Sequence, residues 1–387
     1  MHRMEDAFPR GKTAVVSAVT HGLGESPGFS SMDLAVHAAN KALQQVGLKP
    51  SDVDGLFVCT PDDFLSGLTL SEYLGIQPKV VDNNRTGGSA FLTHMMWAAL
   101  ALTTGQCNVA LITYGSNQRS GSGKLVTPFR PSIYEQPYKP HNPISSYALA
   151  AARHMHHYGT TQEQLGEVAL AARRWAQLNP EAFVRTPLTM DDYLASRLVS
   201  DPLKVLDCCL ATDGAAAIVM MRADQARDYT ARPVHVLGAA AEITHREIAS
   251  MADITVTGAK GSGVRAFAQA KVNPSEIDLV QLYDAFTINT ILFLEDLGFC
   301  KKGEGGAFVS GGRIAPGGEL PVNTNGGGLS CCHPGMYGLF TVVEATRQLM
   351  GLCDERQVAD AQLAVAHGNG GVLSSQATVI LGTPETV

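Results

Sequence analysis

An internal repeat is the sequence feature that most constrains the fold of this chain. Residues 42–59 read ALQQVGLKPSDVDGLFVC, and residues 266–283 read AFAQAKVNPSEIDLVQLY, with Pro50 and Pro274 at equivalent places 224 residues apart. Each copy ends a helical pattern, then has a Pro-Ser pair, an acidic residue and an apolar run. Proline can open a short helical turn, and the apolar run is typical of a buried parallel strand. The repeat therefore predicts two copies of one α/β unit.

The two copies continue in the same order beyond the repeat. A glycine-led apolar helix is predicted at 87–105 and again at 326–351, each followed by a strand, at 108–117 and 363–371. A last strand is predicted at 377–382. Strands that alternate with helices indicate parallel sheets covered by helices, so we expect an α/β protein with two similar α/β halves.

A polar stretch, ADQARDYTARPVHV, separates the two units. We place the halves at residues 1–225 and 226–387, which suits a chain of 387 residues, about twice the usual domain length. The N-terminal half contains an inserted loop and helical region at about 119–202, which resembles a lid. Thr161 and Gln164 have capping-box spacing and predict the start of a helix there.

Charge and composition exclude several classes of function. A formal net charge of −7 leaves no basic face for nucleic acid or an anionic membrane. The first residues lack the apolar core of a signal peptide, and no run approaches the ~18 apolar residues of a membrane span, so we expect a cytoplasmic protein. The eight cysteines are scattered without a C-x-x-C pair, which predicts reduced thiols and no metal site.

Four clusters, three of them glycine-rich, are candidate strand-end sites. They are DNNRTGGSAF at 82–91, YDAF at 283–286, VNTNGGGLSCCHPGMYG at 322–338 and AHGNGG at 366–371. Ligands of open α/β sheets bind beyond the carboxyl ends of the strands. Because the clusters occupy matching places in the two copies, we expect them to converge at the seam between the halves.

One of these clusters carries a family resemblance. NGGGLSCCHPGMYG at 325–338 resembles the N-x-x-G-G-x-x-x-x-G-H-P-x-G element of the thiolase superfamily. The resemblance is to the sterol-carrier-protein branch of this superfamily, and it extends over residues 155–180 and 202–220. YDAF at 283–286 stands in the place of the family's N-E-A-F or H-D-C-F. The resemblance implies the duplicated five-layered α/β thiolase fold, with an acyl-CoA as substrate.

The chain departs from this family at the nucleophile. The position of the thiolase cysteine falls within residues 85–88, which read Arg-Thr-Gly-Gly and offer no thiol. The cysteine of H-D-C-F is Ala285, and the neighbourhood of His367 replaces the cysteine near the C-terminus. A covalent acyl-enzyme of the usual kind is therefore not expected.

The remaining site residues suggest proton transfer. The resemblance assigns His333 to the thioester enolate oxygen, and Tyr283 takes the place of the Asn or His that completes that oxyanion site. Tyr337 follows His333 by four residues, and we expect Asp284 to orient loops or a histidine. A phenol near pKa 10 needs a tuning neighbour to act as a base, and His333 is the candidate. Glycines and polar residues expected to contact the substrate are Gly87, Gly88, Asn325, Gly326, Gly327, His367 and Gly368.

The predicted reaction is a retro-aldol cleavage. A base takes the proton of a 3-hydroxyl, the bond to the α-carbon breaks, and the thioester leaves as an enolate; we favour Tyr283 at the hydroxyl and Tyr337 for protonating the enolate. This resembles the steroid side-chain aldolases of the superfamily, which release a ketone or aldehyde and a short acyl-CoA. No cofactor is expected, because CoA is part of the substrate. The resemblance also implies a homodimer, joined by a small OB-fold companion protein into a heterotetramer.

Three alternatives stay open at this point. A thiolase or acyltransferase could use Cys331 or Cys332 as a relocated nucleophile, or more weakly Ser89. A non-catalytic acyl-CoA or lipid carrier, or a scaffold for the companion, would bind without turnover.

Other motifs are interpreted as structural. The histidines of HMHH at 154–157 fit a solvated helix face better than a metal site, because ligand spacing is lacking. GSGVRAF at 261–267 fits a glycine-led helix start near the pantetheine better than a phosphate loop. Asp207 and Asp213 are expected to fix loops between the halves.

Overall fold

The computed structural model describes residues 8–122 and 133–387. In these residues one mixed sheet has the strand order β3-β2-β4-β7-β1-β8-β11-β10-β9. Its strands are β1 (Thr13–Gly24), β2 (Gly55–Val58), β3 (Val80–Asp82), β4 (Val109–Ser116), β7 (Asp213–Arg222), β8 (Val234–Ile243), β9 (Leu279–Leu282), β10 (Leu363–Gly370) and β11 (Ser375–Gly382).

The strand order reads the same from both ends, as a repeat predicts. In the first half β1 pairs antiparallel with β7, and β2 runs parallel to β3 and β4. In the second half β8 pairs antiparallel with β11, and β9 runs parallel to β10, with a bridge from Val280 to Val322 in the place of β3. The halves join where Ala14 and Val15 of β1 pair with β8. The division proposed at residues 225 and 226 falls in α7 (Ala223–Ala226), between β7 and β8.

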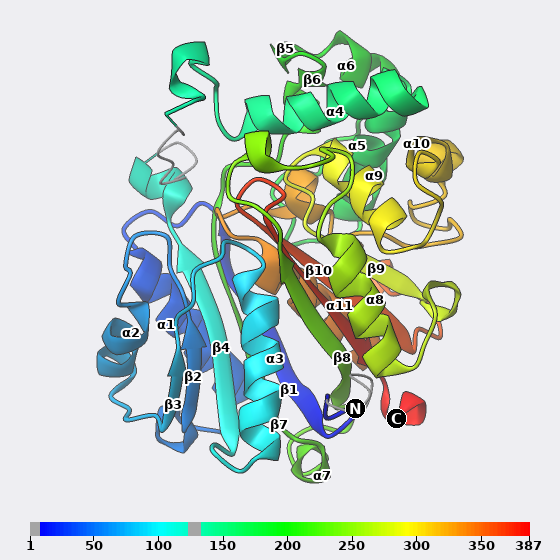
Figure 1. Ribbon diagram of the computed structural model, residues 1–387. Coiled ribbons are helices and arrows are strands. Elements are labelled where there is room, and N and C mark those ends of the chain that lie inside the picture. Colours follow the sequence, from blue (N-terminus) through cyan, green and yellow to red (C-terminus); the bar gives the residue numbers. More distant parts are fainter. Residues whose placement is uncertain (1–7, 123–132) are drawn as a thin grey trace.

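Helices cover both halves and also fill the space between them. α3 (Ala90–Thr103) and α11 (Gly338–Met350) each contact strands of both halves. On the outer side, α1 (Ser31–Gln45) packs against β1, β4 and β7, and α8 (Ala259–Ala270) packs against β8 and β11. Figure 1 shows α3 between the two groups of strands. The layers are therefore helix, sheet, helix, sheet and helix, which confirms the expected five-layered fold.

Alternation along the strands explains two of these layers. In β1, Ala14 and Val16 join the outer core against α1, and Val15 between them joins the central core. This is the two-residue period of a strand with both faces covered. A register shift between Val15 and Ser17 then moves the alternation by one residue, so that Ala18 joins the central core. The proline turns of the repeat are also present, as single 3-10 turns at Pro50–Asp52 and Pro274–Glu276 with proline in the first position.

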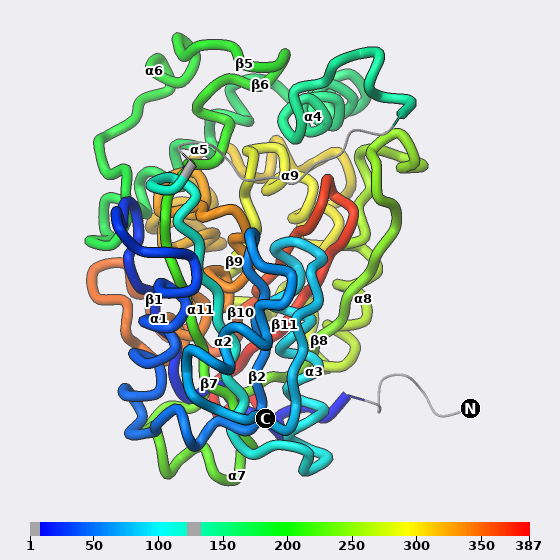
Figure 2. The backbone as a smooth tube through the Cα atoms, turned by 90° about the vertical axis from the view of Figure 1, so that its left-hand side faces the viewer, coloured from blue at the N-terminus to red at the C-terminus, as the bar shows by residue number. Residues whose placement is uncertain are grey.

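The insertion forms a lid at one end of the strands. It contains α4 (Ile144–Tyr158), α5 (Gln162–Gln177), α6 (Met190–Ala195) and the hairpin of β5 (Leu198–Ser200) and β6 (Leu203–Lys204). Figure 2 shows these segments together at the top of the molecule, beside α9 (Thr287–Asp296) of the second half. The remaining helices are α2 (Ser66–Leu74) and α10 (Gly305–Val309). Part of the long proline-rich loop before α4 lies in residues 123–132, outside the described residues.

Two sequence expectations about this lid are confirmed. The Thr161 hydroxyl accepts from the Gln164 backbone N–H at 3.3 Å, and Gln164 Oε1 accepts from the Thr161 N–H at 3.0 Å, which is a capping box. Asp207 Oδ1 accepts the hydroxyls of Tyr193 in the lid and Thr287 in the second half, each at 2.6 Å. Asp207 thus fixes the lid to the second half.

Two expectations need correction. His154 of the HMHH run is buried, not solvated, and its ring contacts the Thr160 hydroxyl at 2.8 Å and Glu295 at 3.1 Å. Residues 261–267 lie inside α8, which begins earlier, at Ala259, so they do not start the helix.

Among the helices of the described residues, none combines the length and the apolar character that a membrane span requires.

Candidate active site

A cavity of about 430 Å³ opens where the two halves meet the lid. Its wall takes residues from all four predicted clusters, so the expectation that they converge is confirmed. Tyr147 of α4 adds a residue from the lid. The wall includes Arg85, Thr86, Gly87, Gly88, Tyr147, Cys209, His245, Arg246, Tyr283, Phe286, His333, Gly335, Asn369, Gly370 and Ser375.

Tyr283 and Gly88 form the centre of this wall. A Cβ on Gly88 would lie 2.0 Å from Cε2 of Tyr283, and a Cβ on Gly87 would lie 2.8 Å from the Cα of Gly370. No side chain fits at either position without displacing its neighbour. The Tyr283 hydroxyl donates to the Gly335 carbonyl at 3.1 Å. Burial raises the pKa of Tyr283 well above 10, so the free protein holds it as a phenol.

His333 faces the same cavity with an unpaired ring. Its backbone is fixed, because its N–H donates to the Thr212 hydroxyl at 3.0 Å and its carbonyl accepts from Gln118 Nε2 at 2.6 Å. Neither imidazole nitrogen has a hydrogen-bond partner among the described residues. The ring lies perpendicular to Tyr283, with centroids 5.4 Å apart. Burial lowers the pKa of His333 to about 4, so a neutral imidazole with one donor and one acceptor is offered to a ligand.

Tyr337 supports these rings from behind. It does not line the cavity, and its hydroxyl donates to Asn325 Oδ1 at 3.0 Å. Its ring lies 5.9 Å from that of Tyr283 and stacks at 6.0 Å on that of His333. The structure therefore places the Tyr337 phenol away from the point where the sequence assigned it a proton.

Asp284 is a second buried support. Its Oδ1 accepts the Gly328 N–H at 2.6 Å, and its Oδ2 has no hydrogen-bond partner among the described residues. A Cβ on Gly328 would lie 3.1 Å from both Asp284 Oδ1 and His333 Cδ2, so the carboxyl and the imidazole both border this glycine. Burial raises the pKa of Asp284 to about 7.

The predicted Asn325, Gly326 and Gly327 belong to this supporting layer and do not line the cavity. Asn325 Oδ1 accepts the Gly327 N–H at 2.8 Å as well as the Tyr337 hydroxyl. A Cβ on Gly327 would lie 2.0 Å from Asp284 Oδ2, which explains the need for glycine. These residues hold the carboxyl and the phenol.

His367 and Gly368 are a further correction, because neither lines the cavity. The His367 ring is buried between Thr378 Oγ1 and Gln376 Oε1, each at 2.9 Å. A Cβ on Gly368 would lie 2.6 Å from Leu92 Cδ1 of α3, so this glycine allows helix packing. Asn369, which the sequence analysis passed over, takes the cavity position at the end of β10.

Tyr147 and Cys209 are two further cavity residues that sequence reasoning missed, as are His245 and Arg246. Tyr147 accepts from Asn369 Nδ2 at 2.9 Å and donates to the Gly371 carbonyl at 3.2 Å. Tyr147 lies in the insertion that the sequence analysis interpreted as a lid, and this position was the one signal that could have indicated a cavity residue. Cys209 lines the cavity, but burial raises its pKa well above 9, which is the opposite of an activated thiol.

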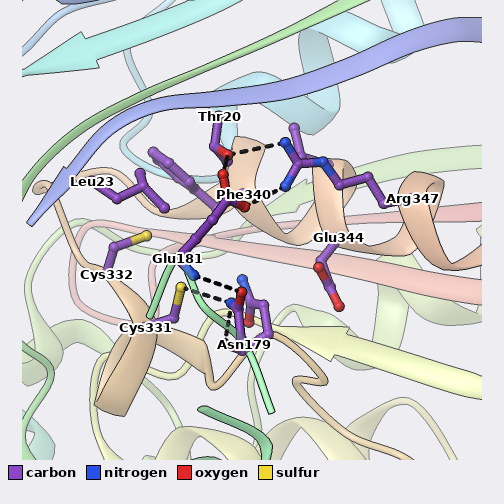
Figure 3. Close-up of a pocket in the computed structure, with 11 residues that line it drawn as sticks. Thr20, Leu23, Asn179, Glu181, Cys331, Cys332, Phe340, Glu344 and Arg347 are labelled. Atoms are coloured by element: carbon purple, nitrogen blue, oxygen red, sulfur yellow. Dashed lines mark hydrogen bonds and ion pairs between the residues drawn. The ribbon is translucent and has the colours of Figure 1, made fainter. Parts of the chain in front are cut away.

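Cys331 and Cys332 lie elsewhere. They line a separate small pocket with Glu181 and Arg347, shown in Figure 3, and not the large cavity. Cys331 Sγ accepts from Asn179 Nδ2 at 3.6 Å, and burial raises the pKa of Cys332 well above 9. Their position gives no support to a relocated nucleophile.

Ser89 is equally constrained. It is buried, and its hydroxyl bonds to Ser375 Oγ at 2.8 Å and to Thr86. These partners are two hydroxyls and the Thr86 carbonyl, and none is a base that could activate it.

Comparisons with known proteins agree with this fold. Residues 240–383 match the family described as thiolase C-terminal domain-like. The chain is 33% identical over 378 residues to the 17-hydroxy-3-oxo-4-pregnene-20-carboxyl-CoA lyase of Mycobacterium tuberculosis, covering 93% of this chain and 97% of the relative. It is 32% identical over 379 residues to an acetyl-CoA acetyltransferase of Methanothermobacter thermautotrophicus, covering 92% and 96%. The solved structure of the Ltp2-ChsH2(DUF35) aldolase matches with a TM-score of 0.88 and 33% identity, over 96% of this chain and 98% of that one.

The chain belongs to the thiolase superfamily, in its sterol-carrier-protein thiolase-like branch. The chain is nearly equally identical to a lyase and to an acetyltransferase, so overall sequence identity does not identify the reaction. The reaction has to be inferred from the residues that line the cavity.

Proposed function

We propose that this protein is a carbon–carbon lyase that cleaves a 3-hydroxyacyl-CoA by a retro-aldol reaction. The products are a ketone or aldehyde and a short acyl-CoA, without a covalent acyl-enzyme. The observation that carries the proposal is the contact of Tyr283 with Gly88, at the end of residues 85–88, where the resemblance places the thiolase cysteine and this chain has no thiol. The lyase and aldolase names of two similar proteins support the same reaction class.

Tyr283 and His333 are the acid–base pair in this proposal. The 3-hydroxyl of the substrate takes the place of the Gly335 carbonyl at the Tyr283 oxygen. Its proton passes to that oxygen as the phenol proton passes to the free imidazole of His333. A buried phenol requires such an acceptor, since its own pKa is raised.

Bond cleavage then follows with all atoms balanced. The hydroxyl oxygen becomes a carbonyl, the bond between the α- and β-carbons breaks, and its electron pair forms the thioester enolate. The proton held by His333 returns to the α-carbon, so no external acid or oxidant is needed. While His333 is cationic, the carboxyl of Asp284 stabilises the charge. Tyr337 positions both rings in this scheme and does not deliver the proton.

The cavity suits a bulky acyl group. Its volume of about 430 Å³ falls in the range of about 300–1,000 Å³ for small-molecule sites, and Ala285, Phe286 and Met336 give it an apolar surface. We propose a steroid or a similarly branched side chain as the acyl group, in line with the steroid lyase among the relatives.

We further propose that the chain acts as a homodimer joined to a companion protein, an OB-fold protein by the family resemblance. The name of the similar aldolase contains two components. A face for self-association is proposed at the sheet edge, where β3 is the last strand among the described residues. Val81 of β3 is exposed beside Gly67 of α2, with exposed Phe64 and Leu68 next to it. Light scattering of the chain alone and with its companion measures both assemblies.

The reaction is tested by product analysis and intact-protein mass spectrometry. The protein, alone and with its companion, is incubated with a branched 3-hydroxyacyl-CoA, and separately with a 3-ketoacyl-CoA plus CoA. A ketone or aldehyde with a short acyl-CoA, and no added mass on the protein, is the expected result. Thiolytic products with an acyl adduct on Cys209, Cys331 or Cys332 would show a thiolase, and binding without turnover would show a carrier.

A further inference from the structure

A buried chain of hydrogen bonds runs from α8 through the second half to the cavity. Every link is 2.7–3.2 Å long and joins side chains until the last, which ends on a backbone carbonyl. The members in order are Ser262, Thr378, His367, Gln376, Asn369, Tyr147 and the carbonyl of Gly371. His367 stands in the middle, and Asn369 and Tyr147 line the cavity.

The state of His367 sets the direction of this chain. Burial lowers the pKa of His367 to about 4, so at neutral pH the ring has one N–H and one acceptor nitrogen. With the proton on Nε2, His367 donates to Gln376 Oε1, Gln376 Nε2 donates to Asn369 Oδ1, and Thr378 donates to Nδ1. With the proton on Nδ1, both amides must turn over to keep their bonds.

The contacts at the two ends favour the Nε2 proton. In that direction Asn369 Nδ2 donates to the Tyr147 oxygen, and Tyr147 can give its one proton to the Gly371 carbonyl. In the reverse direction Tyr147 must donate to Asn369, and the Gly371 carbonyl loses this bond. The only bond that the reverse direction adds is from the Ser262 hydroxyl to the Ala259 carbonyl, at 3.3 Å. That carbonyl already accepts a helical hydrogen bond in α8, so the added bond contributes little.

The orientation of Asn369 matters because Asn369 and its partner Tyr147 both line the cavity. The backbone carbonyl of Asn369 lies 2.8 Å from the position of a Cβ on Gly88, where the ring of Tyr283 also packs, so this residue borders the proposed reaction centre. An amide nitrogen carries two N–H groups. Tyr147 takes one of them, and the other forms no hydrogen bond within the described residues.

We propose that His367 is a positioning residue which, as its Nε2–H tautomer, holds Asn369 through Gln376 with the amide N–H toward the cavity. Asn369 is then a hydrogen-bond donor for a substrate oxygen on which charge develops. This role rests on the proposed retro-aldol function for the identity of that oxygen. The orientation itself does not depend on the reaction.

The orientation is tested first, without substrate. Long-range proton–nitrogen NMR spectra of [¹⁵N]histidine-labelled protein distinguish the two neutral tautomers, and the signal that disappears in His367→Gln identifies His367. A neutral Nε2–H ring at pH 7 is the expected result. A proton on Nδ1, or a charged ring at that pH, overturns the proposal whether or not the protein is a lyase.

Kinetics then test the effect on the site, with a branched 3-hydroxyacyl-CoA as substrate. His367→Leu removes the donor to Gln376, whereas His367→Gln keeps a donor at the same reach. Ser262→Ala is the matched control, because it removes a buried hydroxyl at the far end without changing the direction of the chain. In His367→Leu we expect kcat to fall about 10- to 100-fold and KM to stay within about twofold of the wild-type value. This loss of kcat is smaller than the about 10²- to 10³-fold loss that follows when the hydrogen-bond donor itself is removed.

His367→Gln and Ser262→Ala should stay within about threefold of the wild-type kcat. Equal losses in His367→Leu and His367→Gln, or a wild-type kcat in His367→Leu, overturn the positioning role. If His367→Leu does not fold, the tautomer of the wild-type protein decides the proposal. Absence of turnover in the wild-type protein contradicts the proposed function and leaves the tautomer result to stand by itself.

Discussion

The ring of Tyr283 occupies the space beside Gly88, so that a Cβ on Gly88 would lie 2.0 Å from Cε2 of the tyrosine. Gly88 precedes α3 in the first half of the repeat, and Tyr283 follows β9 in the second half. The two departures from the thiolase pattern, a missing thiol within residues 85–88 and an added tyrosine, therefore lie in contact with each other.

This contact predicts the effect of the smallest side chain at residue 88. Gly88→Ala should displace the Tyr283 ring, lowering the stability by about 1–3 kcal/mol and reducing turnover, because overpacking a filled site strains its neighbours. Thermal unfolding and turnover measure both effects. Gly258→Ala is the control, since the nearest atom to its Cβ would be at 3.4 Å. Wild-type values in Gly88→Ala would show that the tyrosine has space to move.

Tyr283→Phe tests the acid–base pair directly. The ring and its packing remain, and only the hydroxyl at the cavity is lost, so turnover should fall by about 10²- to 10⁴-fold, while acyl-CoA binding is preserved. Steady-state kinetics and calorimetric titration with acetyl-CoA separate the two. A kcat within a few-fold of the wild type would exclude Tyr283 from the proton transfer.

Tyr337→Phe distinguishes support from chemistry. Its hydroxyl bonds to Asn325, outside the cavity, so we expect a smaller loss of turnover than in Tyr283→Phe. Turnover is measured for both variants under the same conditions. A loss as large as that of Tyr283→Phe, at unchanged stability, would favour the role that the sequence suggested, protonation of the enolate.

Asp284 should make stability depend on pH. Burial raises its pKa to about 7 in the folded protein, against an ordinary value of 3.8, so the folded state holds the proton more tightly than the unfolded state does. Its contribution to stability is complete below about pH 4 and is lost as the pH rises to about 7, by up to about 1.4 kcal/mol per pH unit. Asp284→Asn keeps an acceptor for the Gly328 N–H and removes this slope. Denaturant unfolding at pH 5 and pH 8 should therefore show that the free energy of unfolding of the variant rises relative to that of the wild type at the higher pH. An equal pH dependence of the two free energies would contradict the assignment.

The thiols of Cys331 and Cys332 should be dispensable for turnover. Both are buried beside the small pocket of Figure 3, away from the large cavity. Cys331→Ala and Cys332→Ala should retain turnover within about threefold, with a stability loss typical of a small buried side chain. An acyl adduct that disappears in either variant would revive the relocated nucleophile.

Much of the fold follows from local sequence. The proline turns at Pro50 and Pro274, the capping box at Thr161, and the alternating apolar pattern of β1 are each decided by a few neighbouring residues. Their recurrence 224 residues apart predicts a duplicated α/β fold, and the strand order confirms it. Neighbouring residues do not determine how far each strand extends beneath the site.

His367 and Asn369 show that limit. Both are on β10 and both contact Gln376, so their spacing places them on one face of a strand. The cavity reaches only Asn369, because it lies nearer the strand end and, with Gln376, separates His367 from the opening. The sequence predicts the strand, but it does not predict which residues of the strand reach the cavity. That depends on the side chains from other segments that pack over the strand.

The duplicated fold, the lack of a thiol at residues 85–88 and the four clusters that form the site could all be read from the amino-acid sequence. The packing of Tyr283 against Gly88 and the bond of the Tyr337 hydroxyl to Asn325 became visible in the folded structure. Turns, caps and strand periods are set by residues close in the chain, where local geometry is sufficient. The direction of a buried polar side chain is set by the partner that satisfies it, and here the partners come from distant segments brought together by packing.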